Sequence, residues 1–157
     1  MQRPTFRPSR PLKAAVYISF SLLLLTGAAW LYAQGQVEDD EWRKIPPLLM
    51  KIHGGAAMAA LLVLGALTSH VTRGWKADKN RLSGVLLTAV SAFLILTGYG
   101  LYYTSGEELR EWLSLWHAWI GFGLGLLLPA HVIAGRLIMR ASHRRRHPDA
   151  PPRVARE

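Results

Sequence analysis

The chain has 157 residues, half of them hydrophobic, with no cysteine and a formal net charge of +9. Without cysteine there is no disulfide, no thiolate-held metal cluster or zinc ion, and no covalent thioether attachment of a cofactor. The charged residues are absent from four stretches of 24, 21, 25 and 24 residues, namely 14–37, 52–72, 82–106 and 112–135. An apolar helix of about 20 residues crosses the hydrocarbon core of a bilayer. The sequence therefore predicts an all-α integral membrane protein, a four-helix bundle.

Basic residues divide unevenly between the two sides of these expected spans. The two tails and the middle loop hold 15 of the 19 lysines and arginines, and the other two loops hold four. Because positive residues favour the cytoplasmic side, both termini are expected in the cytoplasm of a multi-pass protein of the bacterial inner membrane. The domains are then a basic cytoplasmic tail (1–13), a membrane bundle (14–140) and a basic, disordered tail (141–157). The arginines of residues 141–147 follow the last span closely, which favours a cytoplasmic flanking segment over a nucleic-acid site. No nucleic-acid partner is therefore predicted.

A weak internal repeat relates the two halves of the chain. The segment Leu24–Gly27 matches Ile95–Gly98, and both are followed by an acidic loop containing tryptophan. After each loop comes a span with one histidine near its start and one near its end. The pattern indicates one unit of two helices used twice, with both units entering the membrane from the same side.

Four histidines lie inside the expected spans, where ionisable side chains are costly and indicate function. His53 and His70 belong to the second span, and His117 and His131 belong to the fourth. Because these two spans run in the same direction, His53 and His117 share the outer level of the membrane, and His70 and His131 share the inner level. Two facing neutral imidazoles are the ligand set of six-coordinate haem iron. The pattern predicts haem b as cofactor, two groups or one.

The fourth span suits two stacked haems. His117 and His131 are 14 residues apart, about 21 Å along an ideal helix and about −40° around it. Gly121 and Gly125 on the same face are expected to leave room for a flat porphyrin. Pro129 lies two residues before His131 and is expected to kink the span.

The second span fits this geometry less closely. His53 and His70 are 17 residues apart, about 26 Å along an ideal helix and about −100° around it. Gly54, Ala57 and Ala60 are small enough to admit a porphyrin beneath His53. The outer histidine pair needs no distortion, whereas the inner pair needs a local distortion, a helix tilt or a displaced haem.

Three short segments carry a resemblance to a known family. They are Thr97-Gly98-Tyr99 with Leu101-Tyr102-Tyr103, Trp116-His117 with Gly121, and Leu128-Pro129-Ala130-His131 with Gly135-Arg136. The pattern resembles bacterial four-helix di-haem b-type cytochromes, which include the cytochrome b561 group and the cytochrome b subunits of nickel–iron hydrogenases and formate dehydrogenases. The resemblance covers roughly residues 14–140.

This resemblance implies transmembrane electron transport in a respiratory chain between a periplasmic redox partner and the quinone pool. It implies that His53 and His117 are the axial iron ligands of the outer haem, and that His70 and His131 are those of the inner haem. The expected partners are membrane lipid, quinone and a periplasmic electron-transfer protein or redox enzyme subunit. The first span has no histidine, which excludes a ligand set that draws on this helix.

Two other classes of function stay open. One is a membrane-anchor subunit of a redox enzyme that binds one haem or none. The other is an ion transporter lined by the same histidines, although no aspartate or glutamate lies inside a span to assist it. No catalytic residue is predicted, so the chain is expected to be an electron-transfer protein or the cytochrome b subunit of a respiratory oxidoreductase.

Overall fold

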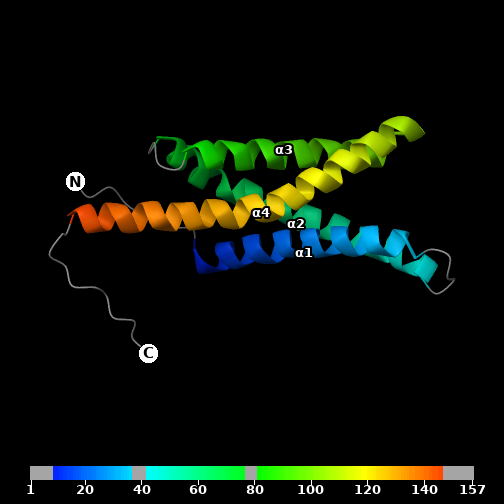
Figure 1. The fold of residues 1–157 in the computed structure, drawn as a ribbon, viewed down its shortest axis with the longest axis horizontal. Coiled ribbons are helices and arrows are strands. Elements are labelled where there is room, and N and C mark those ends of the chain that lie inside the picture. The colour runs from blue at the N-terminus through cyan, green and yellow to red at the C-terminus, as the bar shows by residue number, and fades with distance from the viewer. Residues whose placement is uncertain (1–8, 37–41, 77–80, 147–157) are drawn as a thin grey trace, which may run out of the picture.

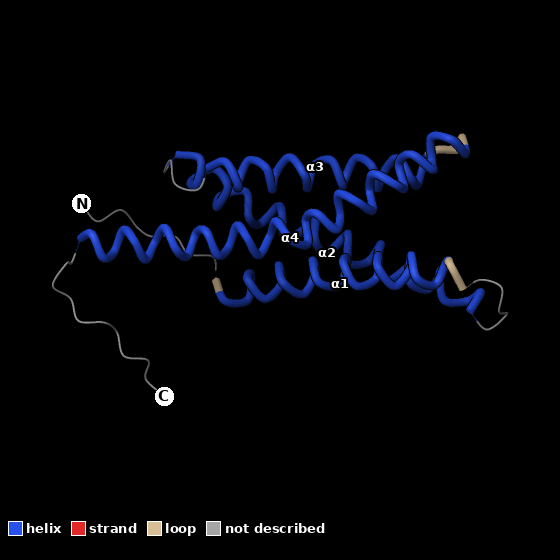
Figure 2. Tube along the Cα trace, in the orientation of Figure 1, coloured by secondary structure: helices blue, strands red, loops and turns tan. Residues whose placement is uncertain are grey.

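A computed structural model of the chain describes residues 9–36, 42–76 and 81–146. Its elements are α1 (Arg10–Gln34), the short 3-10 helix η1 (Trp42–Lys44), α2 (Ile45–Lys76), α3 (Arg81–Tyr103) and α4 (Glu107–Arg146). The described residues contain helices and connections and no strand (Figure 2). Four of the helices are each long and apolar enough to cross a membrane. The predicted all-helical fold with four candidate spans is confirmed.

The first helix begins four residues before the predicted span. Ser9 caps α1, and its hydroxyl accepts a hydrogen bond from the Leu12 N–H at 3.4 Å. Pro11 lies in the first turn, where a backbone N–H has no partner within the helix and proline is therefore tolerated. The predicted tail 1–13 thus gives its last four residues to α1, and residues 1–8 lie outside the described part of the chain.

The last helix is longer than predicted and is not straight. It continues to Arg146 and so includes the first six residues of the tail predicted over 141–157. Pro148 follows shortly afterwards in the sequence, and proline disfavours a helical conformation in the residue before it. Figure 1 shows α4 bending near its middle, and Pro129 lies inside this helix. Proline removes one backbone hydrogen bond there, which explains the bend and agrees with the predicted kink.

The four long helices form two hairpins. The chain reverses direction after each helix, so that the start of α1 and the end of α4 lie on the same side (Figure 1). α1 packs mainly along α2, and α3 packs mainly along α4, whereas the two pairs touch each other much less. We call α1 with α2 the first hairpin and α3 with α4 the second hairpin.

Small residues lie inside and large apolar residues lie outside. Among the described residues, the buried ones are Ser19, Thr26, Ala33, Pro46, Ala56, Ala60, Val63, Ser91, Thr97 and Leu124. Leu62 and Leu126, in contrast, are 78% and 77% exposed. Small residues let helix backbones approach closely, and large apolar side chains on the exterior suit contact with lipid. Such an exterior is typical of helices that could cross a membrane.

Candidate functional site

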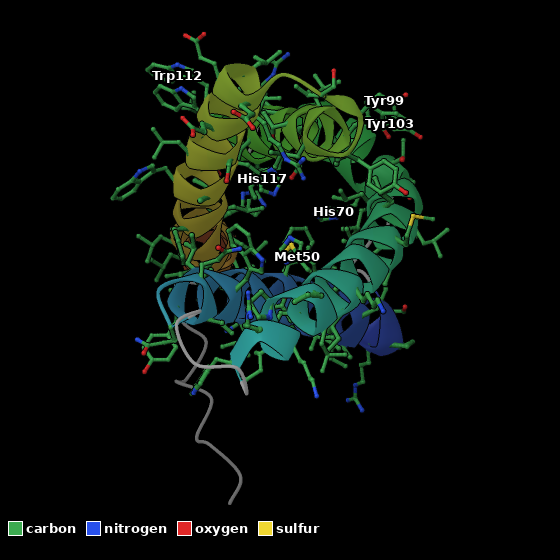
Figure 3. The ribbon with its side chains drawn as sticks, turned by 90° about the vertical axis from the view of Figure 1, so that its right-hand side faces the viewer. Met50, His70, Tyr99, Tyr103, Trp112 and His117 are labelled. Atoms are coloured by element: carbon green, nitrogen blue, oxygen red, sulfur yellow. The ribbon has the colours of Figure 1, made fainter. Side chains whose placement is uncertain are left out.

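The four predicted histidines lie where the two hairpins face each other. His53 and His70 are on α2 of the first hairpin, and His117 and His131 are on α4 of the second. All four side chains are partly buried. Figure 3 looks along the helices and shows His70 and His117 directed toward the axis that the four helices surround. Each hairpin thus contributes one histidine at each of two levels.

His53 and His117 face each other across the two hairpins. Their ring centroids are 6.3 Å apart, and the ring planes form an angle of 68°. A metal–imidazole nitrogen bond is about 2 Å, and the ring centre lies about 1.1 Å behind that nitrogen, so two rings on opposite sides of one metal have centroids about 6.2 Å apart. The separation therefore fits two axial ligands of a single iron, while the ligand role itself stays a prediction.

Thr26 on α1 fixes the orientation of the His53 ring. The Thr26 hydroxyl donates to the Leu22 carbonyl at 2.6 Å, and its oxygen lies 2.9 Å from His53 Nδ1. A hydroxyl has a single hydrogen to donate. When that hydrogen goes to the Leu22 carbonyl, the Thr26 oxygen accepts from His53 Nδ1–H. The lone pair of His53 is then on Nε2.

Thr97 on α3 repeats this arrangement for His117. Its hydroxyl donates to the Phe93 carbonyl at 2.9 Å, and its oxygen lies 2.8 Å from His117 Nδ1. The same reasoning places the proton of His117 on Nδ1 and the lone pair on Nε2. A hydrogen bond from the second ring nitrogen is what orients a metal-binding histidine and fixes its tautomer. His53 and His117 thus have the same tautomer, the one that leaves Nε2 free to bind a metal.

Glycines next to the two threonines let the rings lie close to the neighbouring helix. A Cβ atom added at Gly27 would lie 3.6 Å from His53 Cε1, which is ordinary contact. A Cβ atom added at Gly98 would lie 3.3 Å from His117 Cε1, which is tighter than most such contacts. The His117 ring therefore occupies part of the volume that a side chain at position 98 would need.

The second histidine pair is also brought together, with different support. His131 and His70 lie within electrostatic reach of each other. The Ser83 hydroxyl lies 2.9 Å from His131 Nδ1, and a Cβ atom added at Gly84 would lie 3.9 Å from His131 Cε1. His70 has no hydrogen-bond partner for its ring among the described residues. The pairing of His70 with His131 stays a prediction, and the His70 ring is the less supported of the two among the described residues.

The glycines expected to admit a porphyrin have different surroundings. A Cβ atom at Gly125 would lie 3.1 Å from two methyl carbons of Leu24, and one at Gly121 would lie 3.9 Å from Leu94. Gly125 is therefore the place where α4 receives Leu24 of the first hairpin, and the expectation of open space there is not met. Gly54 does have open space, with nothing within 4 Å of an added Cβ atom.

The sequence prediction did not include the hydroxyl residues beside the histidines. Thr26, Thr97 and Ser83 share one signal that was available: each stands in an apolar span and is followed directly by glycine. Within the described part of the chain, no three His, Cys, Asp or Glu side chains gather as a metal-ion site. A haem iron needs only two axial side chains, because the porphyrin supplies the other ligands.

Comparison with known protein families, with curated proteins and with solved structures gives no match to this chain. The functional interpretation therefore depends on the sequence pattern and on the geometry of the histidines.

Proposed function

We propose that this protein is an integral membrane b-type cytochrome that binds haem between its two hairpins and carries electrons across the membrane. The observation that carries the proposal is the 6.3 Å separation of the His53 and His117 rings. Their hydrogen bonds leave both Nε2 atoms available to one iron. When bound, haem supplies one-electron chemistry by cycling between its ferric and ferrous states.

The histidines of α2 and α4 lie at two levels, so that electron transfer across the membrane takes two shorter steps. His53 and His117 would hold a haem at one level, and His70 and His131 would hold one at the other. The two levels are about 21 Å apart along α4 on ideal geometry, within a hydrocarbon core of about 30 Å. Two groups stacked at these levels shorten each electron transfer to a fraction of the membrane thickness.

The direction of the chain in the membrane follows from its basic residues. The 15-to-4 division of lysine and arginine supports cytoplasmic termini in a bacterial inner membrane. The His53–His117 pair is then at the periplasmic level, near a periplasmic redox partner, and the His70–His131 pair faces the cytoplasm. Tyr99, Tyr103 and Trp112 point outward (Figure 3) at the end that this orientation makes periplasmic, and aromatic residues typically mark a membrane–water boundary. Quinone is the proposed lipid-soluble electron partner.

Haem content tests the proposal most directly. The full chain is purified in detergent, and its reduced-minus-oxidised spectrum and haem-to-protein ratio are measured. We expect a b-type α-band and two haems per chain. The variant with all four span histidines replaced by alanine controls for haem that dissolves nonspecifically in an apolar protein. One haem per chain favours a membrane anchor with a single site, and no haem overturns the proposal in favour of an anchor or an ion transporter.

Reporter fusions test the orientation separately. A reporter that is active only in the periplasm should be inactive at either terminus and active in the loop between α1 and α2. An active reporter at the C-terminus would overturn the orientation and exchange the two levels without affecting the histidine pairs.

A further inference from the structure

Three of the four histidines rest on the same two-residue device. The pairs are Thr26-Gly27 for His53, Thr97-Gly98 for His117 and Ser83-Gly84 for His131. In each case the hydroxyl oxygen lies 2.8 or 2.9 Å from Nδ1 of the ring. A Cβ atom added at the glycine would lie within 4 Å of Cε1 of the same ring. We propose that Thr26, Thr97 and Ser83 are positioning residues, whose hydroxyls keep the proton on Nδ1 and turn Nε2 toward the facing hairpin. The identity of the group that Nε2 meets rests on the proposed function.

The register of the second hairpin explains how the device is used twice there. Ser83 and Thr97 are 14 residues apart on α3, and His117 and His131 are 14 residues apart on α4. Because the two helices are antiparallel, one fixed register brings Thr97 level with His117 and Ser83 level with His131. The same face of α3 therefore supports both histidines of α4.

The first hairpin has this device only once. On α2, 17 residues separate His53 from His70, and 17 residues before Thr26 on α1 is Ser9. Ser9 is the residue that caps α1, so its hydroxyl accepts from the Leu12 N–H and not from a ring. Arg10 follows it in place of a glycine. Among the residues that the structure describes, His70 therefore lacks the support that the other three histidines have.

The threonine hydroxyls are good acceptors because they also donate. Donation to the Leu22 or Phe93 carbonyl polarises the oxygen that faces the ring, and hydrogen bonds in a chain strengthen one another. An acceptor on Nδ1–H raises the basicity of Nε2 and stabilises the more highly charged, ferric form of an iron bound there. Loss of such an outer partner typically lowers metal affinity by about 10- to 100-fold.

The test removes the hydroxyl while keeping the shape. Thr26→Val and Thr97→Val delete the acceptor, and Thr26→Ser and Thr97→Ser restore it. Ser19→Ala is the matched control, because Ser19 is also buried on α1 and also donates to its own helix, at 2.8 Å to the Ala15 carbonyl, but faces no histidine.

The first measurement is nitrogen NMR of the full-length protein labelled at histidine, as purified and chemically reduced. In the wild type, we expect His53 and His117 to be protonated at Nδ1. Each valine variant should change the Nδ1 signal of its own histidine only, and each serine variant should retain it. This readout does not depend on haem, because a protein purified without haem still reveals the tautomer of each ring.

The second measurement is the midpoint potential and haem affinity of the same proteins. We expect each valine variant to raise the potential of the His53–His117 site and to weaken haem binding about 10- to 100-fold, with the serine variants close to the wild type. Wild-type rings protonated at Nε2 would overturn the inference whether or not haem is bound. Valine variants with unchanged Nδ1 signals and unchanged potential would also overturn it. A haem-free protein with Nδ1-protonated rings would support the inference while overturning the proposed function.

Discussion

The two histidine pairs join the same two helices but differ in how their rings are held. His53 and His117 each donate to a threonine on the partner helix of their own hairpin. In the other pair, His131 has Ser83 and His70 has no hydrogen-bonding side chain among the described residues. A hydroxyl in register on the antiparallel neighbour therefore accompanies three of the four rings, whereas matching depth alone does not orient the fourth. The two proposed haem sites should differ accordingly in strength.

Loss of a ligand at the well-supported pair should have the largest effect. We expect His53→Ala and His117→Ala each to reduce the haem content from two per chain to one, because either change removes one axial ligand of the same iron. The visible spectrum of the remaining haem should be the same in both variants. His143→Ala, which lies outside the charge-free spans, is the control for substitution of a histidine and should retain both haems.

The pairing itself is open to refutation by these spectra. If His53→Ala and His117→Ala left two different remaining haems, the two residues would not share a site. The same conclusion would follow if the two haems disappeared together in one variant only.

The second expected effect concerns the other pair. His131→Ala and His70→Ala should each remove the second haem and leave the His53–His117 site intact. His131→Ala should remove it completely, since Ser83 and Gly84 hold that ring against α3. His70→Ala is the more informative change, because the ring that it removes has the least support. A His70→Ala protein that kept two six-coordinate haems of unchanged potential would falsify His70 as a ligand.

The span positions and the approximate helix pairing could be predicted from sequence, because charges are excluded from the hydrocarbon core. The facing of His53 with His117 also follows from depth, since both stand near the start of parallel spans. What depth does not give is rotation about the helix axis. On an ideal helix His70 is rotated by about 100° from His53, and the structure shows only that His70 lies within electrostatic reach of His131.

The supporting residues were harder to predict for a physical reason. A threonine in an apolar helix usually bonds to its own helix four residues back, as Thr26 does to the Leu22 carbonyl. Whether its oxygen also reaches a ring depends on the rotation of the neighbouring helix. The surroundings of Gly125 also depend on the rotation of a neighbouring helix. The small size of this glycine predicts room for a porphyrin, whereas the structure places Leu24 there.

A smaller effect should distinguish two intact sites. We expect the two haems of the wild type to titrate at separate potentials, because hydrogen bonding and exposure of the axial ligands tune the potential. We also expect the His70–His131 site to admit an external ligand such as carbon monoxide more readily, since the unsupported His70 ring is more easily displaced. Potentiometry and carbon monoxide difference spectra measure both properties. A single potential, or preferential ligand entry at the His53–His117 site, would contradict the difference drawn between the pairs.

The smallest expected effects come from substitution of the glycines that lie beside the His117, His53 and His131 rings. An added Cβ atom at position 98 would lie 3.3 Å from His117 Cε1, whereas at position 27 the distance to His53 Cε1 would be 3.6 Å. At position 84 the distance to His131 Cε1 would be 3.9 Å. Gly98→Ala should therefore displace the His117 ring by a few tenths of an ångström and tilt it. Gly27→Ala and Gly84→Ala should leave their rings in place.

We expect all three alanine variants to keep both haems, because none removes a ligand. Gly98→Ala alone should shift the potential of the His53–His117 site, since a tilted His117 ring has a longer hydrogen bond to Thr97. Alanine favours a helix over glycine by about 1 kcal/mol, so Gly27→Ala and Gly84→Ala should keep or raise the melting temperature. Gly98→Ala should gain less, because part of that free energy is lost in displacing the ring. A larger change in potential for Gly27→Ala than for Gly98→Ala would mean that the contact at Cε1 does not control the orientation of the ring, and that the threonine hydroxyl alone does.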